Sequence, residues 1–262
     1  MVTVRTPLGT GLALAAALLF PLKATELQQR TVQAFDDYIR QAEARMDAAK
    51  TFLWADESPD RARRVRQGEI VAQPFTGKAD VSAAGGLIHD WIGVVFIPGA
   101  TVDHTITRLK DYDGHKDIFK PEVLDSRTLS HSGNDYLVYF RLVKKKVVTV
   151  VLNTEFDVRY TQVDATHWRS VSRSRKVAEV QHAGKPDERE LPPGTGGGYL
   201  WKLNSYWRFV ERDGGTYVEC EAISLTRDVP AGLGWLIEPI IRNLPKESLV
   251  NMLGAAQKSL AR

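Results

Sequence analysis

The fold of this chain is decided by the stretch DYDGHKDIFKPEV, residues 111–123. It follows a predicted strand at residues 87–97 and a predicted helix at residues 101–109. It precedes a long series of strands and then a final helix. This order predicts an α+β protein in which a curved antiparallel β-sheet is wrapped around a long C-terminal helix. We expect a hollow interior, which indicates an apolar ligand rather than any particular reaction.

Strand signals dominate the chain from residue 123 to residue 226. The segments richest in β-branched and aromatic side chains predict strands at residues 136–143, 147–160, 166–181, 199–212 and 216–227. Lys144, Lys145 and Lys146 lie between the first two of these segments, so we expect a tight hairpin there. Pro245 suits the first turn of the C-terminal helix. The apolar face of that helix holds Leu249, Met252, Leu253, Ala256 and Leu260.

The N-terminus has the pattern of a secretory signal. Arg5 precedes an apolar run at residues 8–22, and the small residue Ala24 follows it. The run is about 15 residues long, whereas a membrane span needs about 20. We therefore expect residues 1–24 to be a signal peptide and the mature protein to be periplasmic or secreted. An uncleaved N-terminal membrane anchor is the alternative.

Two further segments follow the signal. Residues 26–50 place Phe35, Ile39, Ala42 and Met46 on one face, which predicts an amphipathic packing helix. Residues 56–67 are polar and contain a proline, and we interpret them as a charged linker. The chain is thus divided into a signal (1–24), an N-terminal helix with its linker (25–67) and a main domain (68–262).

Composition excludes several classes of protein. Of 262 residues, 43% are hydrophobic and 26% are charged, which is typical of a folded globular protein. The net charge of +3 is too small to indicate nucleic-acid binding. Cys220 is the only cysteine, so the chain has neither an internal disulfide nor a zinc site built from several cysteines, and we expect an inert buried thiol. The composition does not indicate an oligomeric state.

No motif for a metal, a cofactor or a catalytic group is present. The six histidines (89, 104, 115, 131, 167 and 182) do not have the spacing of metal ligands. Residues 111–122 superficially resemble a calcium loop, but Gly114 stands at the fourth position and Lys116 at the sixth, where the glycine is required. A nucleophile elbow and a phosphate-binding loop are also absent from the sequence.

The junction Asp111-Tyr112 … Phe119-Lys120-Pro121-Glu122-Val123 resembles the helix-to-strand junction of the START, polyketide-cyclase (SRPBCC) and birch-pollen-allergen superfamily. The resemblance to that helix-grip fold covers residues 68–262. It implies a cavity between the sheet and the C-terminal helix that takes lipids, sterols, polyketides or other apolar molecules. Some members are cyclases, hydratases or dioxygenase subunits, and many bind without catalysis. Because the superfamily has no common catalytic motif, the resemblance assigns no catalytic residue.

Two charged residues within the predicted strands could serve such a cavity. If the lysine turn joins its strands in antiparallel register, Arg141 and Glu155 approach one another across neighbouring strands. Inside a cavity they would orient the polar head of a ligand, and on the outer face they would be an ordinary solvated pair. The period-two pattern does not separate the faces, since both carry apolar residues. The residues that we assign to ligand contact are Trp91, Tyr139, Arg141, Glu155, Trp207, Leu249 and Leu253, although aromatic side chains are equally expected in a sheet core.

Three functions remain open at this point. The sequence favours an exported, non-catalytic protein that binds a lipid or another apolar small molecule. The first alternative is a cyclase- or hydrolase-type enzyme that uses acid-base residues in the same cavity. The second alternative acts on a partner or a membrane surface through the N-terminal helix and the basic linker, so transient membrane contact is a possible property. An ionisable pair inside the cavity would favour the enzyme, and an apolar interior would favour the binder.

Overall fold

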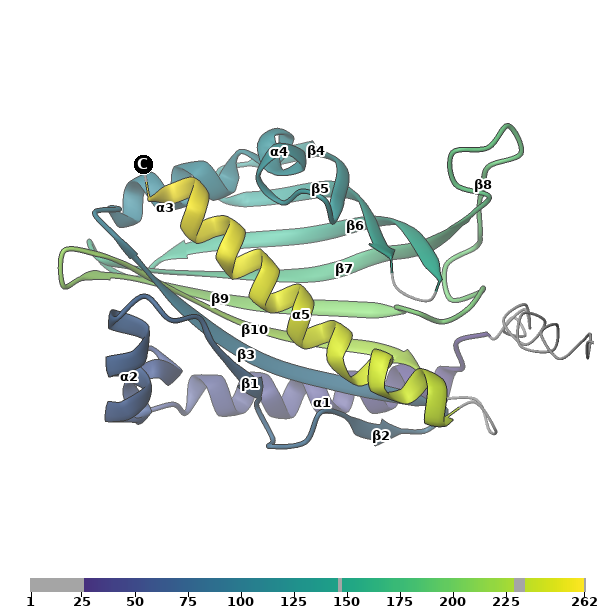
Figure 1. Ribbon diagram of the computed structural model, residues 1–262, viewed down its shortest axis with the longest axis horizontal. Coiled ribbons are helices and arrows are strands. Elements are labelled where there is room, and N and C mark those ends of the chain that lie inside the picture. Colours follow the sequence, from purple (N-terminus) through teal and green to yellow (C-terminus); the bar gives the residue numbers. More distant parts are fainter. Residues whose placement is uncertain (1–25, 146–147, 229–233, 262) are drawn as a thin grey trace, which may run out of the picture.

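One large antiparallel sheet organises the protein (Figure 1). The structure is a computed structural model that describes residues 26–145, 148–228 and 234–261, with side chains in the last segment from residue 243 onward. The main strands lie in the order β1 (Val71–Pro74), β3 (Gly86–Pro98), β10 (Gly215–Arg227), β9 (Lys202–Arg212), β7 (His167–Gln181), β6 (Thr149–Gln162), β5 (Asp135–Lys145) and β4 (Val123–Ser132). The short strands β2 (Val81–Ala83) and β8 (Arg189–Glu190) pair with β3 and β7.

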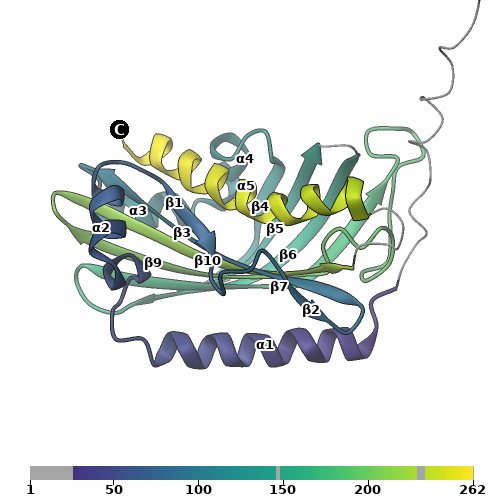
Figure 2. The ribbon, with the colours of Figure 1, turned by 60° about the horizontal axis from the view of Figure 1, so that its bottom comes forward.

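Helices cover both faces of this sheet (Figure 2). The C-terminal helix α5 (Gly234–Leu260) lies across one face, which we call the inner face, and α1 (Gln29–Asp47) lies along the opposite, outer face. The 3-10 helix η1 (Trp54–Glu57) and the helix α2 (Pro59–Arg66) follow α1. Helix α3 (Val102–Lys110), the 3-10 helix η2 (Tyr112–Gly114) and α4 (His115–Ile118) connect β3 to β4. The predicted α+β architecture, with a sheet wrapped around the C-terminal helix, is therefore confirmed.

The predicted strands form close to their expected bounds because their β-branched and aromatic side chains pack well on a sheet whose two faces are both covered. In β10, Val218 and Cys220 join the core beneath α5, while Tyr217 and Ile223 join cores on the outer face. Strands β5 and β6 form the expected antiparallel pair, from Asp135↔Arg159 to Lys145↔Thr149. The expected cap of α3 also forms, because the Thr101 hydroxyl accepts a hydrogen bond from the His104 amide at 3.2 Å.

The expected linker at residues 56–67 is wrong, because this segment folds as η1 and α2. Ser58 caps α2 by accepting from the Arg61 amide, and Pro59 occupies the first helical turn, where its missing amide hydrogen has no cost. Val65 is fully buried in a core with Leu53. Ser-Pro in this chain marks the start of a helix rather than a loop.

The expected start of the C-terminal helix is also wrong. Helix α5 begins at Gly234, so Pro245 lies inside it rather than in its first turn. A proline in a helix interior removes one backbone hydrogen bond, but tertiary packing can override this cost. The predicted signal at residues 1–24 lies outside the described residues. Among the residues that the structure does describe, no helix combines the length and the hydropathy that crossing a membrane requires.

Candidate functional site

The C-terminal half of α5 packs directly on the inner face of the sheet. Leu249, Leu253, Ala256 and Leu260 are at most 2% exposed, and they share a core with Trp91. Helix α5 makes its main contacts with β3 and smaller ones with β1 and β10. The side chains of this half of the helix therefore fill the space above these three strands, where the sequence predicted a ligand cavity.

The inner face continues beyond the strands that α5 mainly contacts, and it remains apolar there. Phe140 on β5, Phe156 on β6, and Leu203 and Trp207 on β9 belong to the same core as α5. Phe156 is buried, but Phe140, Leu203 and Trp207 are only partly buried. The rings of Trp207 and Phe209 are stacked, with centroids 6.1 Å apart. This half-covered apolar surface is the candidate ligand site.

One end of this surface is closed by the stretch that decides the fold. The Tyr112 hydroxyl lies 2.9 Å from the Tyr160 hydroxyl, and Tyr160 donates to the Leu109 carbonyl at 3.3 Å. His115 stacks on Phe140 with centroids 5.7 Å apart, and its Nε2 lies 3.0 Å from the same carbonyl. Burial lowers the pKa of His115 to about 4, so the ring is neutral at physiological pH.

Three of the seven residues assigned to ligand contact lie on the wrong face of the sheet. Val138 and Phe140 belong to the inner core, so Tyr139 and Arg141, which alternate with them on β5, face outward. Glu155 pairs with Tyr139 in the register and shares its face. Trp91, Trp207, Leu249 and Leu253 lie on the inner face, and their contact with a ligand stays a prediction.

The expected approach of Arg141 and Glu155 does not occur. In the register, Arg141 faces Asn153, and its guanidinium donates to Glu188 at 2.8 Å. Glu155 lies 3.8 Å from the ammonium group of Lys176. These are the ordinary solvated pairs of an outer face, and such pairs contribute little to stability.

The sequence reasoning missed a group of buried charges between α1 and the outer face. Asp90, Glu219 and Glu221 are at most 2% exposed. Asp90 accepts from the Tyr38 hydroxyl at 2.8 Å, and burial with the nearby Glu221 raises its pKa to about 8. Burial also raises the pKa of Glu219 to about 7. A signal was present: acids alternate with apolar residues in Val218-Glu219-Cys220-Glu221-Ala222, in a strand that is otherwise buried.

Neither group of residues resembles a metal centre. Within the described part of the chain, no three His, Cys, Asp or Glu side chains gather closely enough to hold a metal ion. Cys220 is fully buried, and burial raises the pKa of its thiol well above the ordinary value, so the thiol is protonated and unreactive.

No protein-family model and no curated protein matches this chain. Solved structures similar to it include a STAR-related lipid transfer protein from Xanthomonas axonopodis, with 17% identity over 70% of this chain and 98% of that one, at a TM-score of 0.43. The aromatase/cyclase Zhui from Streptomyces sp. R1128 has 17% identity over 67% and 94% of the two chains, also at 0.43. Human STARD10 has 11% identity over 89% and 82%, at 0.43.

The topology of the chain itself defines its class. A C-terminal helix lies in the curve of an antiparallel sheet, and short helices connect β3 to β4. This arrangement is a helix-grip fold, the architecture that the resemblance at residues 111–123 implied. The chain adds α1, η1 and α2, which cover the outer face of the sheet.

Proposed function

We propose that this protein binds an apolar small molecule or a lipid on the inner face of its sheet and does not catalyse a reaction. The observation that supports this proposal is the partial exposure of Phe140, Leu203 and Trp207 on an otherwise buried apolar face. Covering ~100 Å² of such surface stabilises a complex by about 2.5 kcal/mol. A ligand with an extended hydrocarbon or aromatic body fits this surface better than a polar one.

The charge distribution favours a binder over an acid-base enzyme. The described carboxylates with raised pKa values, Asp90 and Glu219, lie on the outer face under α1 and η1. Arg141 and Glu155, the pair that the sequence suggested for orienting the polar head of a ligand, also lie on the outer face. The inner face carries apolar and aromatic side chains together with uncharged hydroxyl groups such as that of Ser205, and the buried His115 is neutral.

Native mass spectrometry of the purified protein, followed by solvent extraction, tests whether an apolar molecule copurifies. Titration with the uncharged probe N-phenyl-1-naphthylamine then locates the site. Trp207→Ala and Phe140→Ala should each weaken probe binding at least fivefold. Arg141→Ala, on the outer face of the same strand as Phe140, is the matched control and should bind like the parent. Equal binding by all of these variants would place the ligand elsewhere.

We further propose that the chain is exported and that the mature protein begins near Thr25. The basic and apolar pattern of residues 1–24 supports this proposal. N-terminal sequencing of the native protein provides the test, together with fractionation of the cells. An intact Met1 on a protein recovered from the cytoplasmic fraction would contradict it.

A further inference from the structure

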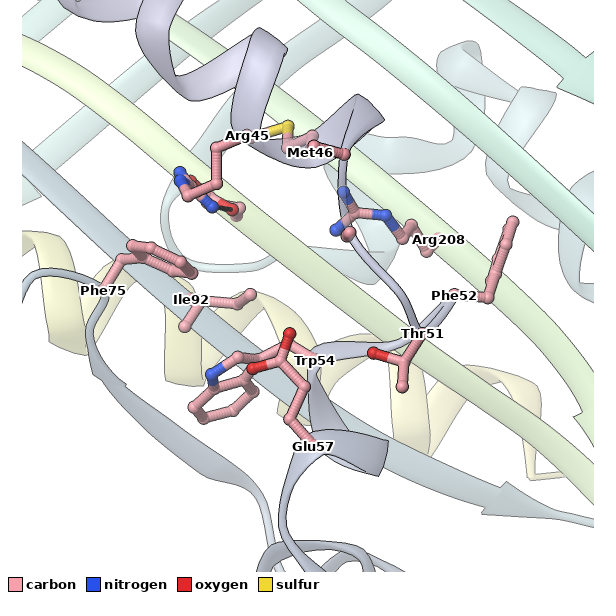
Figure 3. A pocket seen from close by; sticks show the side chains of 12 residues that line it. Arg45, Met46, Thr51, Phe52, Trp54, Glu57, Phe75, Ile92 and Arg208 are labelled. Atoms are coloured by element: carbon pink, nitrogen blue, oxygen red, sulfur yellow. Dashed lines mark hydrogen bonds and ion pairs between the residues drawn. The ribbon is translucent and has the colours of Figure 1, made fainter.

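A second pocket lies on the outer face of the sheet, remote from the inner surface described above (Figure 3). It has a volume of about 320 Å³, which is within the range of small-molecule sites. The C-terminal end of α1 and helix η1 form its sides, and strands β3, β9 and β10 contribute Ile92, Arg208 and Glu221. The pocket therefore exists only because the segment before the helix-grip domain folds onto the sheet.

The carboxylates around this pocket already have partners. Glu221 accepts hydrogen bonds from both terminal nitrogens of Arg45. Glu219 accepts from the amides of Trp54 and Ala55 at 3.0 and 3.1 Å and from Arg208 Nη1 at 3.3 Å. Since these buried oxygens are occupied, the pocket offers few acceptors to a cationic ligand.

Arg208, in contrast, has N–H donors that are not used in hydrogen bonds with the described part of the chain. A guanidinium carries five N–H groups, and the bond to Glu219 uses one of them. Its Nε and Nη2 atoms make no hydrogen bond with any residue that the structure describes. The side chain is 15% exposed, and its guanidinium points into the pocket (Figure 3). The unmet hydrogen-bonding capacity of the pocket is thus that of the Arg208 guanidinium, joined by the Thr51 hydroxyl, whose buried Oγ1 has no partner among the described residues. A carboxylate can accept hydrogen bonds from both groups.

The rest of the lining is suited to an apolar body. The guanidinium carbon Cζ of Arg45 lies 3.5 Å from the centroid of the Phe75 ring, and Cζ of Arg61 lies 3.5 Å from the centroid of the Trp54 ring. These two aromatic rings of the lining therefore stack against arginines. Ile92 and Met46 add aliphatic surface. Glu57 is the acid nearest to solvent, and Arg61 lies 3.7 Å from it. An apolar wall beside a guanidinium that still has free N–H donors is an arrangement suited to binding an aromatic or aliphatic acid.

We propose that this pocket binds a small apolar carboxylate, with its carboxylate on Arg208 and its apolar body against Ile92, Phe75 and Trp54. This site is independent of the inner-face ligand, because the sheet separates the two. Either site can be present without the other.

Calorimetric titration with 2-naphthoate and with the isosteric but uncharged 2-naphthamide tests the proposal. The parent should bind naphthoate at least tenfold more tightly than the amide. Arg208→Gln should remove this preference, and circular dichroism would establish that the variant is folded. Trp207→Ala, on the inner face, should leave the naphthoate affinity unchanged, which separates this site from the proposed inner-face site.

A second variant leaves every ion pair intact. Ala49 is exposed at the edge of the pocket, so Ala49→Trp should narrow the pocket and weaken naphthoate binding tenfold or more without affecting the fold. The proposal is overturned if the parent fails to bind naphthoate at millimolar concentration or binds the amide equally well. Unchanged naphthoate binding by both Arg208→Gln and Ala49→Trp would also overturn it.

Discussion

Leu253 of α5 lies directly over Gly93 of β3. A β-carbon built at position 93 would stand 2.9 Å from Leu253 Cδ1 and 3.1 Å from Leu249 Cδ2. Gly93 is also the register partner of Cys220 on β10, another small residue beneath the helix. The absence of a side chain at position 93 therefore lets α5 approach the sheet closely and bury its leucines completely.

Two glycine-to-alanine substitutions should differ because of this packing. Gly93→Ala inserts a methyl group between three neighbouring side chains and should lower the free energy of unfolding by about 1–3 kcal/mol. Gly254→Ala lies on α5, where the nearest atom is the flexible end of Ile70 at 3.3 Å. The gain in helix propensity of up to ~1 kcal/mol should offset that contact. Urea denaturation of both variants measures the difference, and equal stabilities would contradict the packing described here.

Leu253→Asp should destabilise the protein by several kcal/mol, because it places an unpaired carboxylate at a fully buried position. Binding of N-phenyl-1-naphthylamine should weaken together with stability, since α5 borders the proposed inner-face site. Leu253→Met, which keeps the volume and remains apolar, is the matched control and should cost less than ~1.5 kcal/mol. Thermal unfolding and probe titration provide the measurements. If Leu253→Asp melts like the parent, α5 does not have the packing role assigned to it.

The buried Asp90 should make stability depend on pH. Its pKa in the folded protein is about 8, whereas that of an unfolded Asp is 3.8. Between these values the folded state holds a proton that the unfolded chain has released, so the free energy of unfolding should fall as pH rises from about 4 to about 8. The slope contributed by one such group is at most ~1.4 kcal/mol per pH unit. Asp90→Asn should flatten the curve over this window, measured by denaturation at a series of pH values. An identical pH dependence in parent and variant would show that Asp90 is ionised in the fold.

Glu219 should be required for the docking of η1 on the sheet. Its carboxylate holds the amides of Trp54 and Ala55, and all three groups are buried. Glu219→Leu leaves both amides and Arg208 without this acceptor and should cost more than ~2 kcal/mol. Glu219→Gln keeps one acceptor oxygen and should cost less. Hydrogen exchange at the Trp54 and Ala55 amides reports directly on this contact, and unchanged protection in Glu219→Leu would argue against it.

Local sequence patterns predict the main strands of residues 68–262 and the order of the elements, although not the start of α5. Alternating apolar residues specify strands such as β6 and β10 locally, and Thr101 specifies the start of α3 through its own side chain. The resemblance at residues 111–123 implies the helix-grip fold. Each of these features is specified by a few neighbouring residues, so it can be predicted before any long-range contact is known.

Long-range packing sets which face of each strand is the inner one. Both faces of this sheet are covered by helices, so both carry apolar residues and the period-two pattern has no polar side to mark. For that reason the local pattern does not distinguish Trp207, which lies on the inner face, from Tyr139, Arg141 and Glu155, which lie on the outer face.

The buried charges also depend on long-range contacts. Arg45 and Glu221 are 176 residues apart in the chain, and only the docking of α1 on the outer face brings them together. The same docking creates the pocket around Arg208. A carboxylate on a strand is exposed to solvent unless a helix from elsewhere in the chain packs over it. Its burial therefore depends on the tertiary fold and not on the local sequence.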